Sequence, residues 1–208
     1  MTAFCTRYLP RNLNQQKRTF IVNHSASEIT GADNRCTPVT IRMFLQQAVD
    51  HYPRLVAFSF TLLLPHRDAM TDYHALILRF HAEVWQRTGE YSRELQQERR
   101  GSPPTLLRWI WASTSAPECK MVLLMNLDTL GAARNTQRVE NALQAISVTI
   151  ADVWQTVTDV DHDGITNMTA IIVNRSVRGA FTTPFNQLKA QVQTMQAPVA
   201  TARTGIAG

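Results

Sequence analysis

The pattern of apolar and polar positions is clearest in residues 106–131, where two apolar runs flank a short polar link. The runs are LLRWIWA and MVLLMN, and the link, STSAPECK, contains a proline. Runs rich in aromatic and aliphatic residues are typical of strands, and turn-forming residues are typical of the connection between two of them. The stretch therefore predicts a β-hairpin of two adjacent central strands, on which a site would have a rigid support.

The rest of the chain shows helical spacing in some segments and short, nearly continuous apolar runs in others. Thr37 followed by Pro38 is typical of a helix N-terminus, and prolines bound the apolar run that begins at Arg54. The polar continuation GEYSRELQQERRGSPP indicates either a solvated loop or a frayed helix end. The pattern predicts helices over 37–50, 69–87, 135–158 and 185–195, and strands over 54–64 and 165–173 in addition to the hairpin.

The predicted core order is strand, helix, strand, strand, helix, strand. This order is typical of an α+β fold of the split-βαβ, ferredoxin-like type, in which an antiparallel sheet has helices packed on one face. We expect an N-terminal arm over 1–36 that leads into a helical extension, a single domain over 37–196, and a flexible tail over 197–208. Many unrelated functions share this arrangement, so the fold class does not name an activity.

Composition adds a basic bias and excludes several classes of protein. The 208 residues include 21 Lys and Arg against 16 Asp and Glu, a formal charge of +5, which favours anionic partners. The longest apolar run, LVAFSFTLLL, is too short to span a bilayer, and no secretory signal precedes it, so we expect a cytoplasmic protein without membrane contact. Cys5, Cys36 and Cys119 are odd in number and far apart, which predicts reduced thiols.

Several segments carry a resemblance to a known family. HYPRLVAFSFTLLLP, RFHAEVW, the whole stretch LLRWIWASTSAPECKMVLLMNLDTLG and IADVW, within residues 38–175, resemble the YagK/YfjJ family of prophage and inovirus-type proteins. The resemblance implies an HUH-like replication initiator. In that class, two histidines flanking one bulky residue on a central strand bind a divalent metal, and a tyrosine on a later helix attacks a DNA phosphate.

This chain departs from that pattern at the residues that carry the chemistry. Glu118 and Lys120 stand where the resemblance places the two histidines, and no tyrosine follows Tyr91. A lysine ammonium has no lone pair and repels a cation, and Glu118 alone supplies only one oxygen ligand. Without the metal ligands and the nucleophile, both halves of the mechanism are missing. We therefore predict a degenerate initiator with no catalytic residue and no cofactor.

One further stretch resembles a metal-binding loop. Asp159, Asp161 and Asp163, with Gly164, match the opening of a calcium-binding EF-hand loop. The twelfth loop position is Ala170 instead of the glutamate that closes such a site, and the segment that follows is strand-like. A solvated acidic turn is the favoured interpretation, with weak binding of a divalent ion by these three aspartates as the alternative.

The first hairpin strand offers candidate contacts for nucleic acid. Aromatic side chains on an exposed strand face can stack bases while cationic ones follow the phosphates. Trp109 and Trp111 are two residues apart and share one face, which the helices can equally well cover, so core packing is the alternative. The candidate contacts are Arg108, Trp109, Trp111 and Lys120.

Three functions remain open at this point. The first is a prophage-encoded DNA-binding module, derived from a replication initiator, that binds single-stranded or hairpin DNA without nicking it. The second is a prophage regulatory or protein-interaction protein that no longer binds DNA. The third is a residual metal-dependent nuclease with rearranged ligands.

Overall fold

The computed structural model describes residues 37–66, 70–98, 105–112, 117–130, 136–159, 164–177 and 179–204. All of the described residues belong to one unit of the chain, residues 34–208. The predicted arm over 1–36 lies outside the described residues. None of the described helices combines the length and the apolar content needed to cross a membrane.

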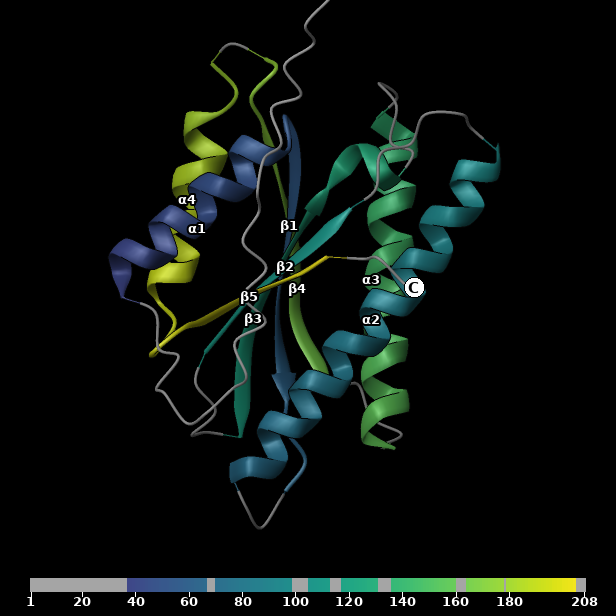
Figure 1. Ribbon diagram of the computed structural model, residues 1–208, viewed down its shortest axis with the longest axis vertical. Helices are drawn as coiled ribbons and strands as arrows, with labels where there is room; N and C mark the ends of the chain where they lie inside the picture. The colour runs from purple at the N-terminus through teal and green to yellow at the C-terminus, as the bar shows by residue number, and fades with distance from the viewer. Residues whose placement is uncertain are drawn as a thin grey trace, which may run out of the picture. The chain divides into compact units, whose positions relative to one another are not determined.

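Four α-helices, a short 3-10 helix and five strands form the described part of this unit (Figure 1). In chain order they are α1 Pro38–His51, β1 Arg54–Leu63, α2 Met70–Glu98, β2 Leu106–Trp111, β3 Glu118–Asn126, η1 Leu127–Leu130, α3 Thr136–Thr158, β4 Ile165–Asn174, α4 Thr182–Gln193 and β5 Val199–Thr204.

The strands form a single sheet in the order β4-β1-β3-β2-β5, and every neighbouring pair is antiparallel. The segment from β1 through α2, β2, β3 and α3 to β4 has the split-βαβ connectivity, with β1 and β3 at the centre of the sheet. The predicted fold class and the predicted hairpin are confirmed. The helix α1 precedes this core, and α4 and β5 follow it.

Local sequence signals explain where α1 begins. Thr37 is its N-cap, and the side-chain oxygen of Thr37 accepts a hydrogen bond from the backbone N–H of Thr40 at 3.2 Å. Pro38 occupies the first turn, where its missing N–H leaves no hydrogen bond unmade. The predicted start of this helix is confirmed.

Successive strand residues face opposite sides of the sheet and build two separate cores. On one side, Val56 and Phe58 of β1 and Trp109 of β2 pack beneath α2 and α3. On the other side, Leu55 and Ala57 of β1 pack beneath α1 and α4. Figure 1 shows the two helix pairs on opposite sides of the sheet. The expectation that helices cover only one face is therefore corrected: α1 and α4 cover part of the second.

The helix α2 continues through the polar segment that was expected to be a loop or a frayed end. A side-chain pair four residues apart reaches into it, with Gln86 Nε2 donating to Glu90 Oε1 at 3.2 Å. The buried face of the helix also extends into the segment, because Ser92, one turn after the buried Thr88, is almost fully covered. Small polar residues at helical spacing continue the packed face where the large apolar residues stop.

The predicted flexible tail over 197–208 is wrong for residues 199–204, which form β5. This strand pairs with β2, with Trp109 opposite Thr201 and Trp111 opposite Val199. Its residues are small or polar, and Val199 and Ala200 are only partly buried. An edge strand buries little surface, so its sequence lacks the apolar run by which the central strands are found.

Candidate functional site

The two residues at the expected metal-ligand positions lie at the beginning of the central strand β3 and are exposed. Val122 and Leu124 of the same strand pack against the α1 and α4 side, so Lys120 and Glu118, two and four residues earlier than Val122, face that side as well. In the register with β1, Lys120 lies opposite Thr61 and Glu118 opposite Leu63. The structure brings these two predicted site residues together on one face, where no helix buries them.

The cover that α4 provides reaches as far as Ser59. The Ser59 hydroxyl donates to Gln191 Oε1 at 2.8 Å, which ties the helix to the sheet. Beyond it, Leu63 is 40% exposed, although Thr61 is still buried. The side chains of Lys120 and Glu118 form no hydrogen bond or ion pair with another residue in the described ranges, although their backbones pair within the sheet. We call this region, formed by Thr61, Leu63, Glu118 and Lys120, the open end of the sheet face.

Cys119 separates the two site residues and points the other way. Its side chain lies in the core under α2 and α3, and its thiol donates to the carbonyl oxygen of Ala112 over 3.5 Å. Burial raises the pKa of Cys119 to about 12. Because the Cys119 thiol is buried on the opposite side of the sheet from Lys120 and Glu118, it adds no chemistry to the open end.

The structure does not assemble a metal site from the described acidic residues. Among those residues, no group of three histidine, cysteine, aspartate or glutamate side chains is positioned to hold an ion. Asp159 is exposed, with φ of 56°, at the end of α3, whereas Asp161 and Asp163 lie outside the described residues. Ala170, at the twelfth position of the loop pattern, lies in β4 opposite Phe58. The segment after the aspartates is therefore a strand, as predicted.

The two tryptophans proposed as a stacking platform are in the core. Trp109 is 0% exposed and Trp111 2% exposed, both beneath α2 and α3. The Trp109 ring stacks on His81 with ring centroids 4.1 Å apart, and Trp111 meets the same imidazole edge-on. The stacking hypothesis is wrong for these residues and the alternative of core packing is confirmed, because α2 covers the face that they share.

Arg108 lies on the opposite face from the tryptophans and is also buried, at 7% exposure. Its Nη2 atom is 2.9 Å from His51 Nδ1, and its guanidinium lies 5.7 Å from the centre of the Tyr52 ring. The other terminal nitrogen, Nη1, is buried without a hydrogen-bond partner. An arginine held in this way supports the end of α1 against the sheet and is not free to contact a phosphate.

The electrostatics of this cluster follow from burial. Desolvation lowers the pKa of Arg108, although the neighbouring Tyr52 opposes the shift. Burial and, secondly, the positive charge of Arg108 lower the pKa of His51. Neutral His51 can accept the Arg108 hydrogen bond, whereas protonated His51 would face a second cation. Sequence reasoning missed this cluster. The signal that could have revealed it is a single arginine within an otherwise apolar strand, because a buried arginine requires a polar neighbour.

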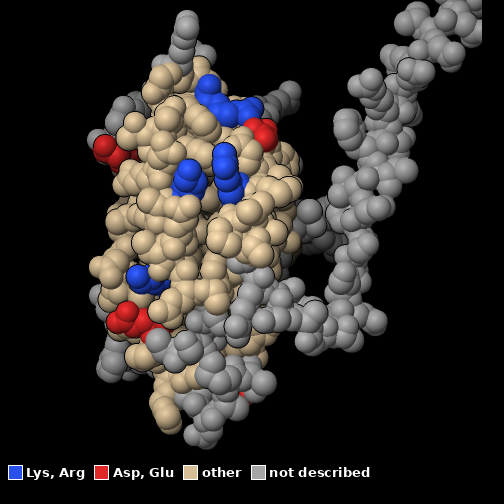
Figure 2. All heavy atoms as spheres, turned by 90° about the vertical axis from the view of Figure 1, so that its left-hand side faces the viewer, with Lys and Arg blue, Asp and Glu red and all other residues tan. Residues whose placement is uncertain are grey.

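The side of the unit that carries α1 and α4 presents mainly basic groups. Figure 2 shows this side with blue side chains at its upper, middle and lower levels and fewer red ones. Arg42 of α1 is exposed and Lys189 of α4 is half-buried, whereas Arg175 pairs with Asp50 at 2.5 Å. By contrast, acidic residues outnumber basic ones along α2 and α3. The open end thus lies on the more positive side.

A family model described as "uncharacterised conserved protein UCP030791" matches residues 27–165, which is more than half of the chain. The chain belongs to the UCP030791 family. The matched part contains α1, β1, α2, the hairpin and α3, and it ends at the first residue of β4. The open end and the Arg108 cluster both lie within the UCP030791 match. No curated protein and no solved structure matches the chain.

Proposed function

We propose that this UCP030791 protein is a DNA-binding module, prophage-encoded and descended from a replication initiator, that binds single-stranded or hairpin DNA without cutting it. The observation that carries the proposal is the position of Lys120. It is exposed on the central strand of a split-βαβ sheet, on the face that α2 and α3 leave free. The resemblance to the YagK/YfjJ family stays a prediction and supplies the link to replication.

Physical chemistry supports a phosphate contact at the open end. An exposed lysine without an intramolecular partner can bind a phosphate at no cost in broken ion pairs. Arg42 of α1 and Lys189 of α4 on the same side, and the formal charge of +5, raise the positive potential that attracts a polyanion. The described part of this face has no exposed aromatic platform, so we expect binding dominated by the backbone, with little preference for sequence.

The same residue argues against cleavage. Lys120 occupies a position where an initiator needs a neutral metal ligand, and its positive charge repels a divalent cation. The helix α4, which follows the last core strand, carries no tyrosine in its sequence. We therefore expect DNA binding without DNA cleavage, and a separate experiment tests each expectation.

The binding experiment measures fluorescence anisotropy of a dye-labelled single strand as salt is raised. For a contact to a single-stranded phosphate, Lys120→Gln should lower the slope of log affinity against log salt by about 0.7. The matched control is Arg93→Gln, which removes one exposed charge from α2 on the other layer. If both variants weaken binding equally, Lys120 makes no specific contact. The protein is then an ordinary basic protein, as the regulatory alternative requires.

The cleavage experiment incubates the protein with Mn²⁺ and an end-labelled single strand. We expect neither a shortened product nor a strand covalently attached to protein. Either product would contradict the proposal and favour a nuclease with rearranged ligands. Glu118→Gln would then decide whether Glu118 supplies an oxygen ligand, since its loss should abolish the cleavage.

A further inference from the structure

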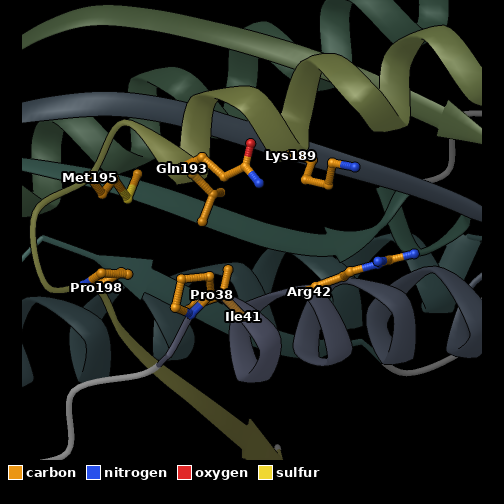
Figure 3. A pocket seen from close by; sticks show the side chains of 8 residues that line it. Pro38, Ile41, Arg42, Lys189, Gln193, Met195 and Pro198 are labelled. Carbon is orange, nitrogen blue, oxygen red and sulfur yellow. The ribbon is translucent and has the colours of Figure 1, made fainter.

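A pocket lies between the first turns of α1 and the last turns of α4, and none of its lining residues belongs to the open end (Figure 3). Its volume is about 110 Å³. The lining residues come from the two helices and from the segment that leads into β5. They are Pro38, Ile41, Arg42, Lys189, Val192, Gln193, Met195 and Pro198.

Two cations mark one end of this pocket. Arg42 extends from α1 and Lys189 from α4, and in Figure 3 both reach toward the same end. Neither side chain has an ion pair or hydrogen bond with any residue that the structure describes, and no carboxylate lines the pocket. Two like charges at one opening repel each other, and an anion placed between them would be attracted to both.

The other end of the pocket is apolar and aliphatic. Ile41, Val192 and Met195 are buried beneath it, and the rings of Pro38 and Pro198 complete the wall. The lining contains no aromatic ring on which a base would stack and no hydroxyl for a sugar. Gln193 offers the single amide among the lining residues. The complementary ligand therefore has an anionic head and an aliphatic body.

The volume limits the size of that body. A cavity of roughly 150 Å³ lined by apolar side chains is known to hold benzene. A pocket of about 110 Å³ is smaller, and its apolar lining is aliphatic, so we assign it a branched chain of roughly four or five carbons.

We propose that this pocket binds a short branched aliphatic carboxylate. Its carboxylate lies between Arg42 and Lys189, and its alkyl group contacts Ile41, Val192 and Met195. The proposal does not depend on DNA binding, because Lys120 and the open end take no part in it.

The test uses the full chain with carbon-13-labelled methionine methyl groups, observed by NMR. The probe is 4-methylpentanoate, and Met195→Leu identifies the Met195 signal. We expect Met195 to shift in a saturable way, with a dissociation constant on the order of 1 mM. Met121 and Met125, in the core on the other face, should not move. Absence of a Met195 shift would overturn the proposal.

Charge and shape are tested separately. The neutral isostere 4-methylpentanamide, and acetate, which lacks the branched alkyl chain, should both bind more weakly than 4-methylpentanoate. Arg42→Gln and Lys189→Gln should each weaken binding of the acid about 2- to 5-fold, as expected for one solvent-accessible ion pair. Lys120→Gln is the matched control and should leave it unchanged. Equal affinity for the amide and the acid would also overturn the proposal.

One added probe separates the two sources of such a carboxylate. N-acetyl-leucine carries the same head and body together with a peptide group, as the C-terminus of a protein would. If it binds at least as tightly as 4-methylpentanoate, the pocket accepts a protein C-terminus. Weaker binding assigns the pocket to a free acid.

Discussion

The two faces of the sheet differ in how completely helices cover them. The face under α2 and α3 is apolar along the whole length of β3, from Cys119 to Met125, and contains the large aromatic side chains. The face under α1 and α4 is apolar from Val122 onward but exposed at Lys120 and Glu118. Both faces are built from the same strands, so successive residues of a strand lie in different surroundings. The first face is covered throughout β3, whereas the second leaves Lys120 and Glu118 exposed to a partner.

The largest expected effect comes from breaking the fully covered face. Trp109→Ala removes a side chain that contacts both Phe80 and His81 and leaves a cavity under α2. We expect the free energy of unfolding to fall by about 3–5 kcal/mol, measured by urea denaturation. Lys120→Gln, on the open end, should change it by no more than about 0.5 kcal/mol. Similar losses in the two variants would contradict the comparison.

Substitution of Arg108 tests whether a buried charge under α1 contributes to the stability of the fold. The guanidinium is buried, but no carboxylate of the described residues accepts its hydrogen bonds, and Nη1 has no partner among those residues. Replacing a poorly paired buried ion by an apolar side chain of similar length is often neutral or stabilising. We expect Arg108→Met to unfold at the same urea concentration as the wild type or a higher one. A loss of more than about 2 kcal/mol would contradict this expectation and show that the contacts of Arg108 with His51 and Tyr52 stabilise the end of α1.

The contact between Ser59 and Gln191 marks the limit of the cover by α4. Its 2.8 Å hydrogen bond is partly buried, so removing it should cost about 1 kcal/mol. Ser59→Ala and Gln191→Ala, measured singly and together, form a double-mutant cycle that isolates this pair. Additive effects of the two substitutions would show that the bond contributes nothing to stability.

The smallest expected effect is a pH dependence at the end of α1. The pKa of His51 is lowered in the folded protein by burial and by Arg108. The unfolded chain therefore binds more protons than the folded one between the folded pKa and the ordinary value of about 6.5. The contribution of His51 to the free energy of unfolding is fully present above its ordinary pKa. It falls as the pH drops from that pKa to the lower pKa of the folded protein. His51→Gln should remove this part of the acid sensitivity in urea denaturation curves recorded across the window.

The sequence predicted most of the core because its elements carry strong local signals. Thr37 and Pro38 fixed the start of α1, and the apolar runs of β1 and β3 fixed the centre of the sheet. The strand β5 was missed because an edge strand buries too little surface to need an apolar run. The cover on the second face was missed because a helix that precedes the core, such as α1, carries no signal for the side on which it packs.

The candidate site was predictable in position but not in orientation. Alternation placed Glu118 and Lys120 on one face, but it could not say whether that face meets helices or solvent. The same ambiguity made Trp109 a candidate for base stacking. In the structure α2 packs over Trp109, so this side chain belongs to the core. The pocket between α1 and α4 depends on two helices far apart in the chain, so no local pattern indicates it.

The position of β1 at the centre of the sheet has a consequence for synthesis of the protein. Both edges of β1 are closed by later segments, by β3 through Leu55 opposite Asn126 and by β4 through Leu55 opposite Val173. At typical translation rates, β3 is made on the order of several seconds after β1. Throughout that interval the apolar strand β1 has no partner on either edge. This strand is therefore the segment for which a chaperone at the ribosome would compete with aggregation.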